Sequence, residues 1–114
     1  MAKRSNPDFL NGVPEMTILK LLESQPMYGY ELVQAIRLRS ENRLDFGEGC
    51  IYPLLHRMEK EGLLSSRKET VSGRERIIYR TTRSGKKRLQ ETVRVWQETV
   101  QGVQAVLKGI QYAT

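Results

Sequence analysis

The stretch that decides the fold covers residues 49–59 and reads GCIYPLLHRME. Its apolar residues recur at i, i+3, i+4 and i+7, which is the spacing of one buried helix face; they are Ile51, Leu54, Leu55 and Met58. Gly62 follows at a position where a left-handed cap ends many helices. The pattern therefore predicts a helix over residues 48–61 with one face in a hydrophobic core.

The opposite face of this predicted helix is polar and basic, and it contains one aromatic ring. A helix fits the major groove of DNA, where an exposed polar stripe can reach base edges and phosphates. Two alternatives stay open, since Tyr52 could be a packed aromatic and His56 a local helix contact. The residues that we predict to contact DNA from this face are Tyr52, Pro53, His56, Arg57 and Lys60.

The segment before this helix predicts two shorter helices. Pro14 suits a first helical position, and the apolar residues after it form a broad face, so a helix is expected over residues 14–24. A second helix is expected over residues 29–39. Residues 1–13 are polar and unpatterned and are expected to form a flexible N-terminal segment. Residues 44–46 are a candidate short strand.

After Gly62 the pattern changes to that of a β-hairpin. Two runs rich in strand-forming residues, 63–69 and 76–82, flank a turn cluster at residues 70–74 that contains Gly73. Basic residues lie at the tip of this hairpin and beside it, where they could reach the flanking DNA backbone or the minor groove. The hairpin residues that we predict to contact DNA are Arg67, Arg74 and Arg76.

Residues 83–111 carry the clearest periodic signal, and Thr82 is the expected N-cap of a long helix. Apolar residues are spaced 4, 3, 4, 3, 4 and 3 apart, which is an unbroken heptad seam. Such a seam predicts pairing with the same helix of a second copy. The predicted dimer interface consists of Leu89, Val93, Trp96, Val100, Val103, Leu107 and Ile110.

Three short helices, a basic hairpin and a long helix follow one another in the order of a winged helix-turn-helix. The expected fold class is therefore mainly α, with a small β-hairpin wing and a long C-terminal dimerisation helix. We expect a DNA-binding domain over residues 14–82 and the dimerisation helix over residues 83–114. Trp96 has a second candidate role, because a flat ring that faces its symmetry mate can stack on a planar hydrophobic effector.

The charge distribution indicates a polyanionic partner. The chain has a net charge of +6, and residues 57–88 alone contain eleven Lys or Arg and four Glu, a surplus of seven. A basic segment of this kind is the expected footprint of a nucleic acid.

Several functions are disfavoured by what the sequence lacks. No nucleophile–base set, glycine-rich phosphate loop or metal-ligand spacing is present, so we expect no catalytic site, metal or cofactor. Cys50 is the single cysteine, which excludes an intramolecular disulfide. It is expected to be a semi-buried small residue, and a redox switch is the open alternative. No apolar run approaches the roughly 20 residues of a membrane span. A cytoplasmic protein without a membrane partner is therefore expected.

Several motifs together resemble the PadR-like family of transcriptional regulators, in its short form with one C-terminal helix. The resemblance covers about residues 15–100. The chain departs from the family pattern at Tyr28, where relatives usually have His, at Cys50, where Ser or Thr is usual, and at residues 77–79, which are less basic. The matching motifs are YGYEL at 28–32, GCIYPLLHRME at 49–59, EGLL at 61–64, GR at 73–74 and YRTT at 79–82 with Gly85.

The resemblance implies a dimeric repressor that binds a pseudo-palindromic operator in double-stranded DNA. In many members of this family a phenolic or other planar hydrophobic inducer releases the DNA, and in some it lies in the dimer interface. Three other functions stay open as alternatives: an enzyme, a helical module that only dimerises, and a protein that binds RNA or any nucleic acid. The family's DNA-facing positions fall on Tyr52, Pro53, His56, Arg57 and the Gly73–Arg74 tip.

Overall fold

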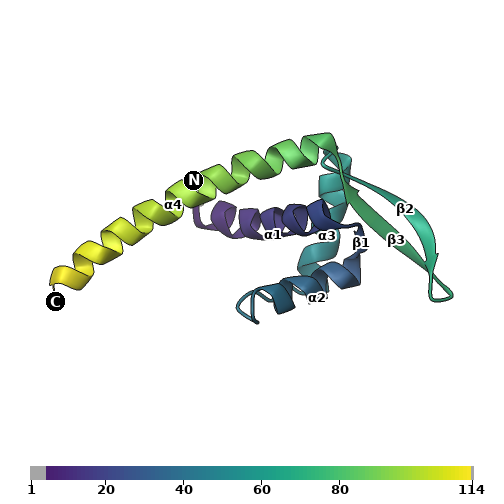
Figure 1. Ribbon diagram of the computed structural model, residues 1–114, viewed down its shortest axis with the longest axis horizontal. Coiled ribbons are helices and arrows are strands. Elements are labelled where there is room, and N and C mark those ends of the chain that lie inside the picture. Colours follow the sequence, from purple (N-terminus) through teal and green to yellow (C-terminus); the bar gives the residue numbers. More distant parts are fainter. Residues whose placement is uncertain (1–4, 114) are drawn as a thin grey trace.

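The structure is a computed structural model that describes the backbone of residues 5–113 and the side chains of residues 12–108. Helices α1, α2 and α3 form a small bundle, a β-hairpin extends from one end of it, and α4 runs along α1 and projects beyond it (Figure 1). The mainly α winged helix-turn-helix with a long C-terminal helix is confirmed. Its elements are α1 (Ser5–Ser24), β1 (Met27–Tyr28), α2 (Gly29–Arg39), α3 (Glu48–Lys60), β2 (Leu64–Val71), β3 (Arg74–Thr81) and α4 (Arg83–Ala113).

The sheet is antiparallel, with β3 between β1 and β2. The β2–β3 hairpin, called the wing below, pairs from Leu64 opposite Thr81 to Val71 opposite Arg74. The two turn residues, Ser72 and Gly73, have φ angles of 52° and 77°. Positive φ at both positions gives the turn whose twist matches that of a hairpin. The turn is therefore shorter than the expected cluster over 70–74, because the strands continue to its two ends.

The expected strand over residues 44–46 is wrong. These residues form no regular element, and the side chains of Leu44 and Phe46 pack against the core instead. The third strand is Met27–Tyr28, which pairs with Tyr79 and Ile78 of β3. A strand of two residues is too short to show an alternation of apolar and polar residues in the sequence. Its pairing depends on the turn after α1, which brings it to the free edge of β3.

One face of each helix packs into the hydrophobic core. The predicted buried face of α3 is confirmed at Ile51, Leu55 and Met58, each at most 1% exposed, whereas Leu54 is only partly buried. Gly62 has a φ of 83°, which confirms the left-handed residue after α3. The side chains buried most completely are Ile18, Leu19, Leu32, Ile51, Leu55 and Met58.

Helix α1 is longer than expected. It begins at Ser5, so Pro14 lies inside it and the predicted start at Pro14 is wrong. The expected flexible segment 1–13 is helical from Ser5 onward, and residues 1–4 lie outside the described part of the chain. The added turns lie beside α4, since Gly12 and Val13 line a pocket together with Trp96. This contact of Gly12 and Val13 with α4 is tertiary, so no local sequence pattern predicts it.

Thr82 joins the wing to α4 and caps that helix, as predicted. The N–H of Gly85 donates to Thr82 Oγ1 at 3.1 Å. The Thr82 hydroxyl lies 2.7 Å from the carbonyl oxygen of Gly62 and 3.1 Å from that of Leu63. The first turn of α4 is therefore attached to the residues that follow α3.

The start of the heptad seam packs inside its own chain. Leu89 is 4% exposed and belongs to the core, and Val93 packs against that core. The assignment of Leu89 to the dimer interface is therefore a mistake, because α1 and the rest of its own chain already cover this side chain.

The later seam residues become steadily more accessible. Trp96 and Val100 are half-buried, and Val103 and Leu107 are 52% and 53% exposed. Ile110 lies outside the residues whose side chains are described. The described part of α4 thus presents an apolar stripe that its own chain leaves uncovered.

Candidate nucleic-acid interface

The exposed face of α3 carries the residues predicted from the sequence. Tyr52, Pro53, His56, Arg57 and Lys60 are all exposed, while the core face of the same helix is buried. Two basic residues, Arg57 and Lys60, lie in the last turn, where a cation also interacts favourably with the helix dipole. This face can therefore present an aromatic ring, an imidazole and positive charge to a groove.

Tyr52 rests on the first turn of α2. A Cβ atom added to Gly29 would lie 2.3 Å from Tyr52 Cε1, so only glycine allows the ring this position. Burial, and next the charge of Glu48, raises the pKa of Tyr52 above its ordinary value. A tyrosine phenol is protonated at neutral pH even at its ordinary pKa, so Tyr52 can donate a hydrogen bond to a phosphate or a base. Sequence reasoning missed this role of Gly29.

A cleft of about 260 Å³ lies between α3 and the wing and brings residues from both elements together. The Arg76 guanidinium carbon lies 4.6 Å from the centre of the Tyr28 ring, a cation–π contact. Arg76 Nε is buried and has no hydrogen-bond partner among the described residues. The side chain is thereby held at the cleft beside Tyr52 instead of extending into solvent. The lining residues are Tyr28, Gly29, Tyr52, His56, Glu75, Arg76, Ile77 and Tyr79.

The other two wing arginines that are predicted to contact DNA differ in their surroundings. Arg74 is exposed at the tip, directly after the two turn residues. Arg67 donates to Glu69 at 2.8 Å, and this hydrogen bond lowers the pKa of the Glu69 carboxyl. Because Glu69 offsets part of its charge, Arg67 offers a weaker attraction for a phosphate than Arg74.

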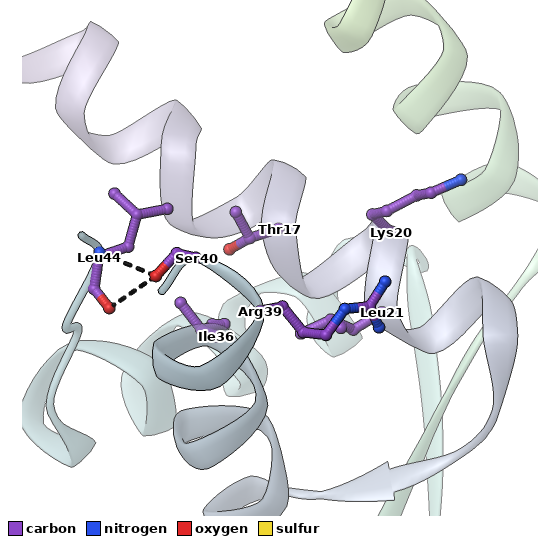
Figure 2. A pocket seen from close by; sticks show the side chains of 7 residues that line it. All are labelled: Thr17, Lys20, Leu21, Ile36, Arg39, Ser40 and Leu44. Atoms are coloured by element: carbon purple, nitrogen blue, oxygen red, sulfur yellow. Dashed lines mark hydrogen bonds between the residues drawn. The ribbon is translucent and has the colours of Figure 1, made fainter. Parts of the chain in front are cut away.

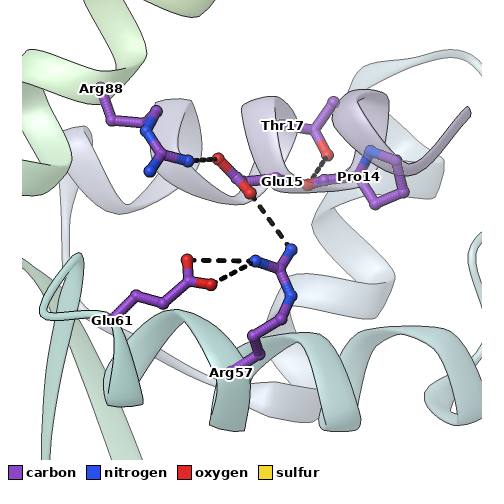
Figure 3. A network of polar contacts seen from close by, with 6 residues as sticks. All are labelled: Pro14, Glu15, Thr17, Arg57, Glu61 and Arg88. Carbon is purple, nitrogen blue, oxygen red and sulfur yellow. Dashed lines mark hydrogen bonds and ion pairs between the residues drawn. The ribbon is translucent and has the colours of Figure 1, made fainter. Parts of the chain in front are cut away.

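Arg57 lies at the edge of the exposed face that is turned toward α1. Its guanidinium donates to Glu61 at 3.0 and 3.1 Å and to Glu15 at 3.2 Å (Figure 3). Glu15 also accepts from Arg88 of α4 at 2.8 Å. Sequence reasoning missed Glu15. The DNA contact of Arg57 stays a prediction, and within the chain its guanidinium has the carboxylates of Glu61 and Glu15 as partners.

A separate apolar pocket of about 240 Å³ lies between α1 and α2 (Figure 2). At its end the Leu44 N–H donates to the Ser40 hydroxyl, which ties the loop before α3 to the end of α2. None of the residues predicted to contact DNA lines this pocket. Its lining consists of Thr17, Lys20, Leu21, Ile36, Arg39, Ser40 and Leu44.

Two further expectations concern single residues and metals. Cys50 is exposed near the start of α3, so its expected semi-burial is wrong; the buried face of the helix begins only at the next residue, Ile51. Within the described residues, no group of three or more His, Cys, Asp or Glu could hold a metal ion. None of the helices in that same part of the chain is long and apolar enough to span a membrane.

Comparisons with known proteins agree on one family. The sequence model described as "Transcriptional regulator PadR-like family" matches residues 18–91. A transcriptional regulator of Mycobacterium tuberculosis is 32% identical over 96 residues, which cover 84% of this chain and 87% of the relative.

Solved structures of similar sequence have the same fold. A PadR-like transcriptional regulator of Bacillus cereus superposes with a TM-score of 0.74 at 34% identity, over 88% of this chain and 96% of its own. A transcriptional regulator of Clostridium thermocellum gives a TM-score of 0.77 at 28% identity, over 84% and 94% of the two chains.

Proposed function

Because the chain belongs to the PadR-like family of transcriptional regulators, which bind DNA and are not enzymes, we propose that it is a homodimeric repressor of an inverted-repeat operator in the cytoplasm. The observation that carries the proposal is the cleft where Tyr52 and His56 of α3 meet Arg76 of the wing. Two elements that present such groups side by side can follow a groove and its flanking backbone at once.

In this proposal α3 enters the major groove and the wing lies along the neighbouring backbone. Tyr52, Pro53, His56 and Lys60 are the groove-facing groups of α3, and they share one exposed face. Arg74 reaches a phosphate from the wing tip, and Arg67, opposite Ile78 and further from the tip, adds a weaker contact. Arg76 contacts the DNA from the cleft. Arg57 lies at the edge of the same face, where its guanidinium donates to the carboxylates of Glu61 and Glu15.

The dimer is proposed to form through the far half of α4. Exposed apolar side chains there include Val103 and Leu107, and an exposed apolar stripe of this kind is typical of a protein–protein interface. Residues 83–114 thus serve as the dimerisation helix and residues 14–82 as the DNA-binding domain. Pairing would set the two α3 helices about 34 Å apart, one helical turn of DNA.

A planar hydrophobic effector is proposed to bind at Trp96. A pocket of about 160 Å³ lies next to its ring, between α1 and α4, with Val13, Met16 and Val95 in its lining. An apolar hollow beside a half-buried indole suits a flat ligand, and such a ligand would contact the same stripe that pairs the chains.

Trp96→Ala is expected to weaken the dimer, because an indole in the seam buries a large apolar surface that alanine cannot replace. The dissociation constant of the dimer should rise roughly tenfold or more, as for an interface hot spot. Sedimentation equilibrium measures it, with Gln101→Ala on the opposite side of α4 as the control. A constant unchanged from that of the wild type would exclude Trp96 from the interface.

Arg74→Ala is expected to reduce the affinity for all DNA sequences by a similar factor, about fivefold near physiological salt, since one phosphate contact is lost. The slope of log K against log salt should fall by about 1. Fluorescence anisotropy at several salt concentrations measures both. Arg94→Ala, which removes an arginine from the ion pairs of α4 with Glu91 and Glu98, is the matched control and should change neither value.

Selection of bound duplexes from a random library tests the function as a whole. The enriched DNA should contain a two-fold repeat with half-sites about 10 base pairs apart. It should bind at least about 10³ times tighter than random DNA at physiological salt. Enrichment of no sequence, or tighter binding to RNA than to any duplex, would contradict operator binding and favour one of the alternatives.

A further inference from the structure

One buried carboxylate links three helices. Glu15 of α1 is the single charged residue classed as buried among those whose side chains are described. Its side chain is 11% exposed, whereas those of Arg57 and Arg88 are 46% and 43% exposed. An isolated carboxylate at such a site would be unfavourable, so Glu15 depends on its two arginines more than they depend on it.

Each carboxylate oxygen of Glu15 accepts a hydrogen bond from a different helix. Oε1 accepts from Arg57 of α3 at 3.2 Å, and Oε2 accepts from Arg88 of α4 at 2.8 Å (Figure 3). Glu61 completes the group by holding the other nitrogen of Arg57 at 3.0 Å. These four residues are called the Glu15 network below, and their formal charges cancel.

Besides the apolar packing of Leu89 and Val93, the network is the second of two polar points that attach α4 to the region of α3. The first is Thr82, whose hydroxyl binds the carbonyl oxygens just after α3. Arg88 lies about 9 Å further along the helix at 1.5 Å per residue. Leu89 and Val93 hold α4 against the core, and the two polar points fix the direction of the helix on this packing.

We propose that Glu15 is a positioning residue: it sets the angle between α4 and α3 and thereby the separation of the two α3 helices in the dimer. The inference rests on the proposed function, because it assumes that α4 pairs two DNA-binding chains. Leu107 lies about 28 Å beyond Arg88 along the helix. A pivot of about 7° at Arg88 would therefore move it by about 3.5 Å, close to the roughly 3.4 Å rise of one base pair.

The test measures affinity for operators whose spacer is shortened or lengthened by one base pair, and for an isolated half-site. Wild-type protein should prefer its own spacing by about tenfold, since other spacings require the DNA to deform. Glu15→Gln should reduce this preference to about threefold or less, while half-site affinity stays unchanged. Arg88→Met should have the same effect, and the double variant should add little to either one.

Glu98→Gln is the matched control, because it removes a carboxylate from an exposed ion pair of the same helix; it should keep the wild-type preference. If Glu15→Gln folds poorly, Arg88→Met still tests the positioning role, because Arg88 lies at the surface and its replacement leaves the core intact. Equal weakening at every spacing, or additive effects of the two substitutions, would overturn the positioning role. Wild-type protein without preference for any spacing would overturn the proposed function itself, and the inference with it.

Discussion

Replacing Val103 and Leu107 together by aspartate is expected to convert the protein into a folded monomer and to abolish operator binding. Both side chains are about half exposed and lie outside the chain's own core, so each chain can fold with aspartate at these positions. In the dimer the same positions would bury carboxylates in an apolar seam, which strongly disfavours pairing. Affinity for the inverted repeat should fall by about 10³ or more, toward the non-specific range.

Sedimentation velocity measures the loss of the dimer, and fluorescence anisotropy the loss of operator binding. Gln101→Asp is the control, because it adds the same charge to the opposite side of α4, where the side chain is exposed. A double aspartate variant that sediments as a dimer would contradict the seam. One that is monomeric but binds the repeat with wild-type affinity would contradict dimeric recognition.

Local periodicity predicted the elements around α3 because there the pattern and the burial have the same cause. Ile51, Leu55 and Met58 are apolar at helical spacing, and the structure buries all three. Gly62 and Gly73 both have positive φ, as their positions after a helix and in a hairpin turn require. These features depend on neighbours in sequence, so a sequence is sufficient to predict them.

Periodicity could not tell which chain covers an apolar face. Leu89 and Leu107 belong to the same heptad seam, yet the first is 4% exposed and the second 53% exposed. The difference arises because α1 runs beside only the first half of α4 (Figure 1). A seam predicts a partner surface but not whether that surface belongs to the same molecule.

Periodicity also could not predict that Glu15 is a partner of Arg57, because the two residues lie in different helices. The sequence nevertheless contains a signal. Glu15 precedes Ile18, Leu19 and Leu22 by three, four and seven residues, so it lies on the apolar face of α1. An acid on a buried face requires a buried cation or donor, and that requirement predicts an arginine partner without naming it.

Gly85→Ala is expected to destabilise the fold strongly. A Cβ atom there would lie 2.3 Å from the carbonyl oxygen of Leu63 and 2.4 Å from Thr81 Oγ1. The Leu63 oxygen cannot move freely, because it accepts the backbone N–H of Thr82 at 3.1 Å. The substitution therefore forces apart the junction of wing and α4, at a cost of about 3 kcal/mol.

Thermal and urea denaturation followed by circular dichroism measure this loss. At about 4–8 °C per kcal/mol for a domain near this size, the midpoint should fall by roughly 12–24 °C. Gly49→Ala is the matched control, since nothing lies within 4 Å of its added Cβ and alanine favours a helix over glycine; its midpoint should not fall. If Gly85→Ala melted with the control, the Thr82 junction would be able to open without cost, and it could not serve as the fixed first point from which Glu15 sets the direction of α4.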